Sequence, residues 1–239
     1  KARQLIQKFS PGPLTVLLPR KEIIPDLVTS GLNTVAIRIP DHPLTLRLLR
    51  QLDFPLAAPS ANPFGYISPT TAQHVADQLG DKIPYILDGG STHVGVESTI
   101  VGFEKEEAVI FRLGGLPVEE IEKLIGKVSV AIQESSNPQS PGMLQSHYAP
   151  RKKLIFNPGE KITGAAIGVI AFDTYLEDYP AGSQVLLSPS GDLHEAARHL
   201  FAAMRQLDNS DVELIIAVPF PEEGLGLAIN DRLKRAAAG

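Results

Sequence analysis

An alternation of apolar with small or charged side chains runs through the stretch Thr34-Val35-Ala36-Ile37-Arg38-Ile39-Pro40. Because successive side chains of a β-strand point to opposite faces, the three branched apolar residues share one face, and Thr34, Ala36 and Arg38 share the other. This pattern predicts a strand with one face open around a single guanidinium. Such a group grips a carboxylate or phosphate in a two-pronged geometry that lysine cannot reproduce. The alternative is an ordinary solvated sheet face, where most arginines lie.

Further strand-like runs surround this one and alternate with helical stretches. Ser68 followed by Pro69 predicts an N-cap and first helical position, with the helix running through about Leu79. Toward the C-terminus, an apolar helical pattern over 193–207 lies between two continuous apolar runs, which predicts a βαβ unit and a small parallel sheet. The predicted strands are 14–18, 35–39, 56–58, 85–87, 99–103 and 109–113, followed by 167–172, 185–187 and 214–218.

A cluster of turn-forming residues divides the chain into two domains. The stretch Ser135-Ser136-Asn137-Pro138-Gln139-Ser140-Pro141-Gly142 interrupts the apolar periodicity on both sides. We therefore predict a first domain over 1–130, a linker over 131–153 and a second domain over 154–239. The linker carries apolar and aromatic residues, Tyr148 among them, which favour contact with a surface. We accordingly expect Gln145–Tyr148 to close over the active site as a lid.

Composition narrows the function classes. The chain has 239 residues, 43% of them hydrophobic, a net charge of −5 and no cysteine, which excludes disulfides and thiolate chemistry. The charge is −1 over 1–130, +2 over 131–153 and −6 over 154–239. An acidic C-terminal region repels a phosphate backbone, so we expect no broad nucleic-acid face there. Because no stretch approaches the length of a membrane span, we expect a cytoplasmic location and no membrane partner.

Several loops hold candidate binding residues, although each alone is an ordinary turn sequence. Ser60 and Asn62 lie in a loop of small residues after an apolar run, and Ser98 follows a glycine turn. Arg112 alternates with apolar neighbours and projects from the face opposite to theirs. Familiar catalytic motifs are missing, and the six histidines lack metal-ligand spacing, so we predict no protein metal site.

The ordered set of motifs resembles YrdC-type threonylcarbamoyladenylate synthases in both order and spacing. The later Ser140-Pro141-Gly142-Met143, His147-Tyr148-Ala149-Pro150 and Glu223-Gly224-Leu225-Gly226 resemble the longer members with an additional C-terminal domain. The motifs of the first domain are Phe9-Ser10-Pro11-Gly12-Pro13-Leu14-Thr15, Arg38-Ile39-Pro40, Pro59-Ser60-Ala61-Asn62, Ile67-Ser68-Pro69-Thr70, Leu87-Asp88-Gly89-Gly90 and Gly95-Val96-Glu97-Ser98-Thr99-Ile100-Val101.

The resemblance implies a fold, a reaction and a set of site residues. The fold would be an α/β protein with a twisted mixed-sheet YrdC-like domain followed by a smaller Rossmann-like parallel α/β domain. The enzyme, a nucleotidyltransferase, would form threonylcarbamoyl-AMP and pyrophosphate from L-threonine, bicarbonate and ATP with Mg²⁺, for tRNA threonylcarbamoyladenosine modification. Residues implied to bind L-threonine are Arg38, Ala58 and Ser98, and those implied to bind ATP are Thr34, Ser60, Asn62, Ser68, Arg112 and Tyr148.

One departure from the family pattern concerns the N-terminus. Family members carry a Lys-x-Arg motif on a strand well before the Phe-x-Pro-Gly-Pro segment, and Lys1-Ala2-Arg3 lies too close to Phe9 to be its equivalent. We therefore expect the first domain to be N-terminally incomplete, with its catalytic residues unassigned.

The resemblance implies that downstream tRNA threonylcarbamoyl-transfer proteins receive the product, with direct tRNA binding left open. Two other functions also stay open, an RNA-binding module and a nucleotide-binding regulatory protein of the same fold without catalysis.

Overall fold

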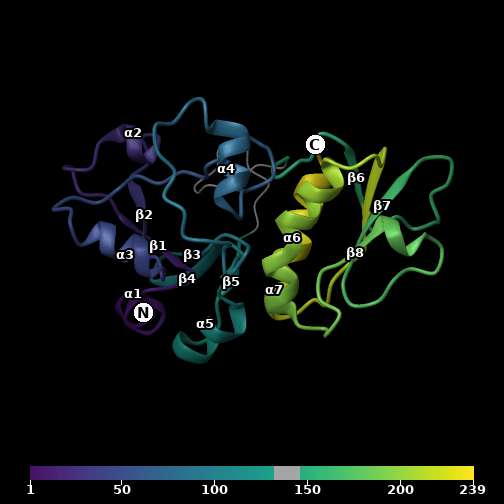
Figure 1. The fold of residues 1–239 in the computed structure, drawn as a ribbon. Helices are drawn as coiled ribbons and strands as arrows, with labels where there is room; N and C mark the ends of the chain where they lie inside the picture. Colours follow the sequence, from purple (N-terminus) through teal and green to yellow (C-terminus); the bar gives the residue numbers. More distant parts are fainter. Residues whose placement is uncertain (132–145) are drawn as a thin grey trace. The chain divides into compact units, whose positions relative to one another are not determined.

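A computed structural model describes residues 1–131 and 146–239 and divides them into two compact units (Figure 1). The first unit joins Lys1–Pro59 to the chain that starts at Glu97 and runs to the undescribed segment. The second joins Ser60–Val96 to the chain from residue 146 to Gly239. Most of the predicted linker lies outside the described residues, so the predicted domain boundaries stay predictions. No helix in the described ranges is long and apolar enough to cross a membrane.

The first unit contains a mixed sheet of five strands in the order β2-β1-β3-β4-β5. β1 pairs antiparallel with β2 and parallel with β3, while β3 pairs antiparallel with β4 and β4 parallel with β5. This confirms the predicted mixed α/β class. The strands are β1 (Leu14–Pro19), β2 (Thr34–Arg38), β3 (Thr99–Glu104), β4 (Glu107–Arg112) and β5 (Ser129–Val130).

Apolar side chains cover both faces of the central strands in the first unit. Leu17, Ile100, Val109 and Phe111 form one buried cluster. Helix α1 contacts β1 and α5, and each helix contributes a fully buried residue, Leu5 and Ile121. Packing on both faces therefore fixes the positions of the central strands. The helices are α1 (Ala2–Phe9), α2 (Asp26–Thr29), α3 (Pro43–Leu49) and α5 (Val118–Ile125).

The second unit contains an all-parallel sheet in the order β6-β9-β7-β8, which confirms the predicted parallel α/β fold. Helices α6 and α7 cover one face of this sheet (Figure 1). On the opposite face, Val169 and Ile216 pack against loop residues such as Tyr179. The elements are α4 (Ala72–Leu79), β6 (Lys153–Phe156), β7 (Ile167–Ala171), η1 (Ala181–Ser183), β8 (Gln184–Leu186), α6 (Leu193–Asp208), β9 (Leu214–Ala217) and α7 (Gly224–Ala237).

Two of the predicted strands are wrong. Residues 56–58 and 85–87 form no regular element, and their apolar side chains are exposed, as the values of 48% for Leu56 and 59% for Leu87 show. An apolar run becomes a strand only when a neighbouring strand takes its backbone hydrogen bonds, and in the described residues neither run has that pairing.

The predicted start of the helix at Ser68 is also wrong. Helix α4 begins at Ala72, and the Thr71 hydroxyl accepts the backbone N–H of His74 as its N-cap. Both residues are good capping types, but the backbone over 69–71 is not helical, so the helix starts after Thr71 and not after Ser68.

Candidate functional site

The predicted site residues fall into two groups, one in each unit. Thr34, Arg38, Ala58, Ser98 and Arg112 belong to the first unit. The second unit contains the remaining predicted residues, Ser60, Asn62, Ser68 and Tyr148. The two groups correspond neither to the predicted threonine set nor to the predicted ATP set.

Ser98 is the centre of the first group. It precedes β3 and is 3% exposed, and its hydroxyl oxygen lies 2.6 Å from the hydroxyl oxygen of Thr15 on β1. Arg112, at the end of β4, donates from Nε and Nη2 to the Ser98 carbonyl at 3.0 and 2.9 Å, and from Nη2 to its hydroxyl at 3.1 Å. These charge-assisted bonds fix both the main chain and the side chain of Ser98.

The backbone around Ser98 is held equally closely. The Thr99 hydroxyl donates to the Leu116 carbonyl at 2.6 Å and accepts the Leu116 N–H at 3.0 Å. At Gly114 a Cβ atom would lie 2.4 Å from the Ser98 carbonyl carbon, so only glycine allows the two backbones to approach this closely. Ser98 therefore occupies a preformed position, which suits a residue that orients a small ligand.

Arg38 lies at the end of β2, directly across from Thr15 in the antiparallel register. Residues paired in this way place their side chains on the same face of the sheet, so Arg38 and Thr15 share a face. The Arg38 side chain is exposed, but the surrounding protein partly desolvates its guanidinium, which lowers the pKa of Arg38. The group stays protonated at neutral pH and is available to an anionic ligand.

The remaining residues of the first group are more open to solvent. Thr34 begins β2, four residues before Arg38, and is exposed. Ala58 is exposed and lies outside any helix or strand. The structure thus brings Ser98 and Arg112 together, and places Thr34 and Arg38 on one strand face as predicted from the alternation.

In the second group, Asn62 shapes the loop that carries Ser60. Its side-chain nitrogen donates to the carbonyls of Pro63 and Tyr66, both at 2.9 Å. Its side-chain oxygen is buried and has no hydrogen-bond partner among the described residues. A buried acceptor without a partner is costly, so a donor from a ligand or a water molecule would stabilise this site. Ser60 itself is exposed.

Ser68 is 7% exposed, and its main chain is fixed by an arginine from the second sheet's helix layer. Arg205 of α6 donates from Nε to the Ser68 carbonyl at 3.3 Å and from Nη2 to the Ile67 carbonyl. On the C-terminal side, the Thr70 N–H donates to Nδ1 of His74 at 3.2 Å. Burial and the Arg205 cation lower the pKa of His74, which favours the neutral ring that can accept this bond.

A buried carboxylate on α6 holds the neighbouring Tyr66. The Tyr66 hydroxyl donates to Asp208 at 2.6 Å, and Arg151 pairs with the same carboxylate at 2.9 Å. Burial and this bond raise the pKa of Tyr66 to about 12. Burial opposes ionisation of Asp208, but hydrogen bonds from Tyr66, the Lys152 backbone and Arg151 outweigh it and lower the pKa of Asp208.

Tyr148 belongs to the core of the second unit. It is 1% exposed, and its ring stacks on Phe201 of α6 with centroids 5.4 Å apart and planes at 29°. The Arg232 guanidinium of α7 lies 5.3 Å from the ring centroid. The backbone of Tyr148 has a φ of 63°, a left-handed conformation that is rare for such a side chain. The predicted contact of Tyr148 with ATP stays a prediction. The lid predicted over Gln145–Tyr148 also stays a prediction, and its first residue lies outside the described residues.

Neither the two cavities below nor the metal-ligating side chains of the described residues point to a further candidate site. The second unit has hollows of about 390 Å³ beside Thr71 and Asp88 and about 550 Å³ beside Lys161 and Gln184, and neither is lined by a predicted site residue. Within the described ranges, no three His, Asp or Glu side chains gather closely enough to hold a metal ion.

Sequence reasoning assigned no role to several residues that hold the predicted ones in place. Thr15 belongs to the Phe9–Thr15 motif without a predicted role of its own, although it pairs with Arg38 in the strand register. Arg205 and Asp208 are charged residues on the apolar stripe of α6, at 5% and 3% exposure. Charges on the buried side of an amphipathic helix are the signal that would have identified both.

The fold and these two groups define an α/β protein with one mixed and one all-parallel sheet. The sequence profile Sua5_yciO_yrdC, described as telomere recombination, matches residues 1–114, and the profile of the threonylcarbamoyl-AMP synthase C-terminal domain matches 116–238. The chain therefore belongs to the threonylcarbamoyl-AMP synthase family, in which threonylcarbamoyl-AMP is the compound also called threonylcarbamoyladenylate.

Full-length relatives agree with this assignment. The chain is 40% identical over 258 residues to threonylcarbamoyl-AMP synthase of Pyrococcus abyssi, covering 99% of this chain and 74% of the relative. It is 41% identical over 254 residues to the enzyme of Bacillus subtilis, covering 100% and 73%. The crystal structure of P. abyssi Sua5 complexed with L-threonine superimposes with a TM-score of 0.88 at 38% identity, covering 99% of this chain and 73% of that one.

Proposed function

We propose that this chain is a threonylcarbamoyl-AMP synthase, a nucleotidyltransferase that forms threonylcarbamoyl-AMP and pyrophosphate from L-threonine, bicarbonate and ATP. The observation that carries the proposal is the match along nearly the whole chain to relatives of that name, one of which has been solved with L-threonine. The preformed Ser98 position before β3 and the guanidinium of Arg38 on β2, with β1 between the two strands, supply what a small zwitterion needs, a cation for its carboxylate and fixed polar atoms.

Threonine would bind in the first unit. Arg38 would take the carboxylate, Ser98 would orient the amino acid through its hydroxyl, and Ala58 would leave room for the side chain. The residues that we propose to bind ATP are Thr34, Ser60, Asn62, Ser68, Arg112 and Tyr148. The buried Asn62 oxygen fits this role because it lacks a donor within the described part of the chain.

The chemistry requires positioning and charge stabilisation more than a protein nucleophile. The threonine amine adds to bicarbonate with loss of water and gives a carbamate. A carbamate oxygen then attacks the α-phosphorus of ATP, the bond from that phosphorus to the bridging oxygen of the β-phosphate breaks, and pyrophosphate leaves. Arg38 would hold the amino acid while Arg112 stabilises charge on the phosphates, so that the reacting atoms meet in a fixed orientation.

Mg²⁺ enters this proposal as the companion of the triphosphate. The described residues offer no cluster of three acidic or histidine ligands, and Mg²⁺ commonly binds through nucleotide phosphates and water with few protein ligands. When bound, it would neutralise phosphate charge.

The product is a reactive mixed anhydride, so a protein that transfers the threonylcarbamoyl group to tRNA must take it up quickly. We therefore propose downstream tRNA threonylcarbamoyl-transfer proteins as partners and the cytoplasm as the location.

Pyrophosphate release tests this function against the two alternatives. Release from ATP that requires both L-threonine and bicarbonate supports the synthase. ATP binding without threonine-dependent release would indicate a nucleotide-binding regulator. RNA binding that weakens with salt, in the absence of ATP turnover, would indicate an RNA-binding module.

A further inference from the structure

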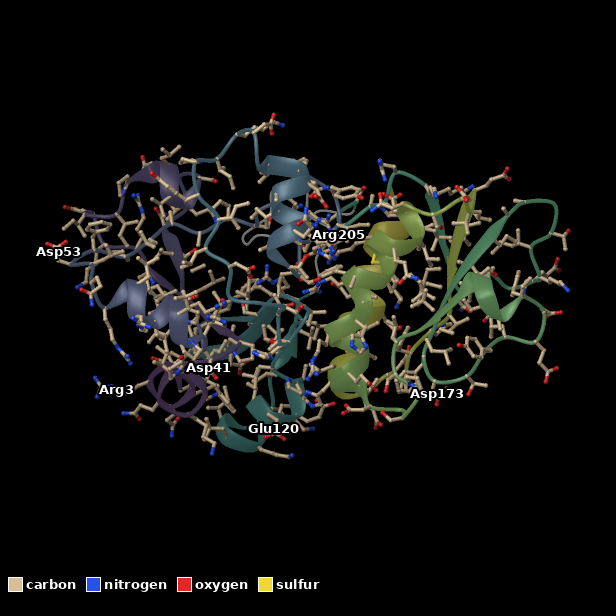
Figure 2. The ribbon with its side chains drawn as sticks, in the orientation of Figure 1. Arg3, Asp41, Asp53, Glu120, Asp173 and Arg205 are labelled. Atoms are coloured by element: carbon tan, nitrogen blue, oxygen red, sulfur yellow. The ribbon has the colours of Figure 1, made fainter. Side chains whose placement is uncertain are left out.

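Arg205 projects from α6 toward α4, which carries Gln78, and is 5% exposed (Figure 2). Its guanidinium donates to the carbonyls of Ile67 and Ser68 and to the side-chain oxygen of Gln78, the last at 3.0 Å. The Ile67 and Ser68 carbonyls belong to the two peptide groups that flank Ser68. One rigid guanidinium therefore fixes both peptide planes on either side of a predicted ATP residue.

The same helix restrains the segment 62–70 at a second point. Asp208 lies three positions after Arg205, so the two side chains lie on one face of α6. Asp208 accepts the Tyr66 hydroxyl at 2.6 Å, and the Tyr66 ring lies under the Arg205 guanidinium at 5.1 Å from centroid to Cζ. Three successive residues, 66 to 68, are thus held by two side chains of one helix.

Helix α6 also approaches a second loop of this unit. Gly95 has a φ of 81°, and a Cβ atom there would lie 2.3 Å from both the Ala197 carbonyl oxygen and Arg198 Cα. Arg198 donates from Nε to the His93 carbonyl at 3.0 Å. The loop that leads to Ser98 is therefore packed directly on the α6 backbone, which makes α6 a common support for two loops.

The chemistry of Arg205 favours positioning over simple stability. Its hydrogen bonds go to neutral acceptors, and burial lowers the pKa of Arg205, which shows the cost of desolvating the cation. A well-packed apolar residue stabilises a core as well as a buried cation does. What an apolar residue cannot supply is a fork of donors that aligns two successive carbonyls.

We propose that Arg205 is a positioning residue of the nucleotide site, acting through the main chain at Ser68. The inference rests on the proposed function in assigning Ser68 to ATP. Its consequence is that Arg205, on the helix layer of the C-terminal sheet, raises the affinity for ATP and leaves threonine affinity unchanged.

The test compares dissociation constants for ATP and for L-threonine, measured separately by calorimetry on the whole chain. Gln184→Met is the matched control, because buried Gln184 likewise donates to two loop carbonyls, Leu176 at 2.8 Å and Tyr179 at 2.7 Å. We expect Arg205→Met to raise the ATP dissociation constant about tenfold or more, and Arg205→Lys to raise it less. Threonine affinity should stay within about twofold, and Gln184→Met should lower Tm with ATP affinity unchanged.

A double-mutant cycle shows whether Arg205 acts through Ser68. In a Ser68→Ala background, Arg205→Lys should add little further loss of ATP affinity. Additive losses, unchanged ATP affinity in folded Arg205→Lys, or an equal loss in Gln184→Met would each overturn the inference. If Arg205→Met does not fold, Arg205→Lys and the cycle still decide. A wild-type chain that binds neither ATP nor threonine would instead overturn the proposed function.

Discussion

The hydroxyl oxygens of Thr15 and Ser98 lie 2.6 Å apart, although 83 positions separate the two residues in the chain. Both side chains are buried, Thr15 at 7% and Ser98 at 3% exposure. The pairing of β1 with β3 brings them together, and Arg38 faces Thr15 across the other edge of β1. Thr15 therefore connects the two residues proposed to bind threonine.

We predict that Thr15→Val weakens threonine binding, because the buried Ser98 hydroxyl keeps Arg112 but loses Thr15, the nearer of these two partners, and with it a fixed orientation. The loss of one buried hydrogen bond should also cost about 1–3 kcal/mol in the free energy of unfolding. Thr99→Val is the matched control, since the Thr99 hydroxyl bonds only to the backbone of Leu116 in the described structure. Urea unfolding and calorimetry should show both variants destabilised and only Thr15→Val impaired in threonine affinity. If Thr15→Val and Thr99→Val bind L-threonine with equal affinity, Thr15 has no part in threonine binding.

Arg38→Ala should weaken threonine binding by about 1.5–3 kcal/mol, or roughly ten- to a hundredfold, through the loss of a charge-assisted pair. Arg38→Lys keeps the charge but loses the two-pronged geometry, so we expect an intermediate effect. Because Arg38 is exposed, the free energy of unfolding should change little. If calorimetry shows unchanged threonine affinity in both variants, Arg38 does not bind threonine and lies on an ordinary solvated sheet face.

Arg112→Lys should weaken both ligands, in contrast to Arg38→Lys. Arg112 is proposed to bind ATP. Its two hydrogen bonds of 3.0 and 2.9 Å to the Ser98 carbonyl also hold Ser98, which is proposed to bind L-threonine. Lysine cannot supply both bonds. Steady-state kinetics should therefore show a raised KM for ATP and for L-threonine. A raised KM for ATP alone would mean that Ser98 keeps its position without this clamp.

The Tyr66–Asp208 hydrogen bond makes the free energy of unfolding fall as the pH becomes alkaline. The folded-state pKa of Tyr66, about 12, exceeds its ordinary value of 10.0, so the stabilisation is complete below pH 10 and is lost as pH rises toward about 12. The difference between wild-type and Tyr66→Phe tyrosinate absorbance should show one group titrating near pH 12. Denaturation at several pH values should show wild-type stability falling toward that of the variant. A difference titration centred near pH 10 would contradict the buried bond.

The sequence predicted the α/β class and the parallel second sheet because both rest on periodic apolar patterns. It failed at 56–58 and 85–87, where an apolar run has the composition of a strand but no pairing partner in the described structure. The helix start was misplaced because Ser68 and Thr71 are both good capping residues, and only the folded backbone distinguishes them.

The candidate site was predictable as a set of residues but not as an arrangement. The strand face around Arg38 follows from alternation alone. The contact of Ser98 with Thr15 depends on strand order, and the contact of Arg205 with Ser68 joins residues 137 positions apart. Long-range pairings of this kind leave no local pattern, apart from the charged residues that interrupt the apolar stripe of α6.

The incorporation of isotope from bicarbonate tests the central claim most directly. The full-length protein is incubated with ATP, Mg²⁺, L-threonine and ¹³C-bicarbonate, and the nucleotide products are separated and analysed by mass spectrometry. The account predicts threonylcarbamoyl-AMP that carries the label in its carbamoyl carbon, formed together with pyrophosphate and absent when threonine is omitted. ATP bound by the folded chain with no labelled product, under conditions where a relative such as the B. subtilis enzyme forms it, would contradict the account.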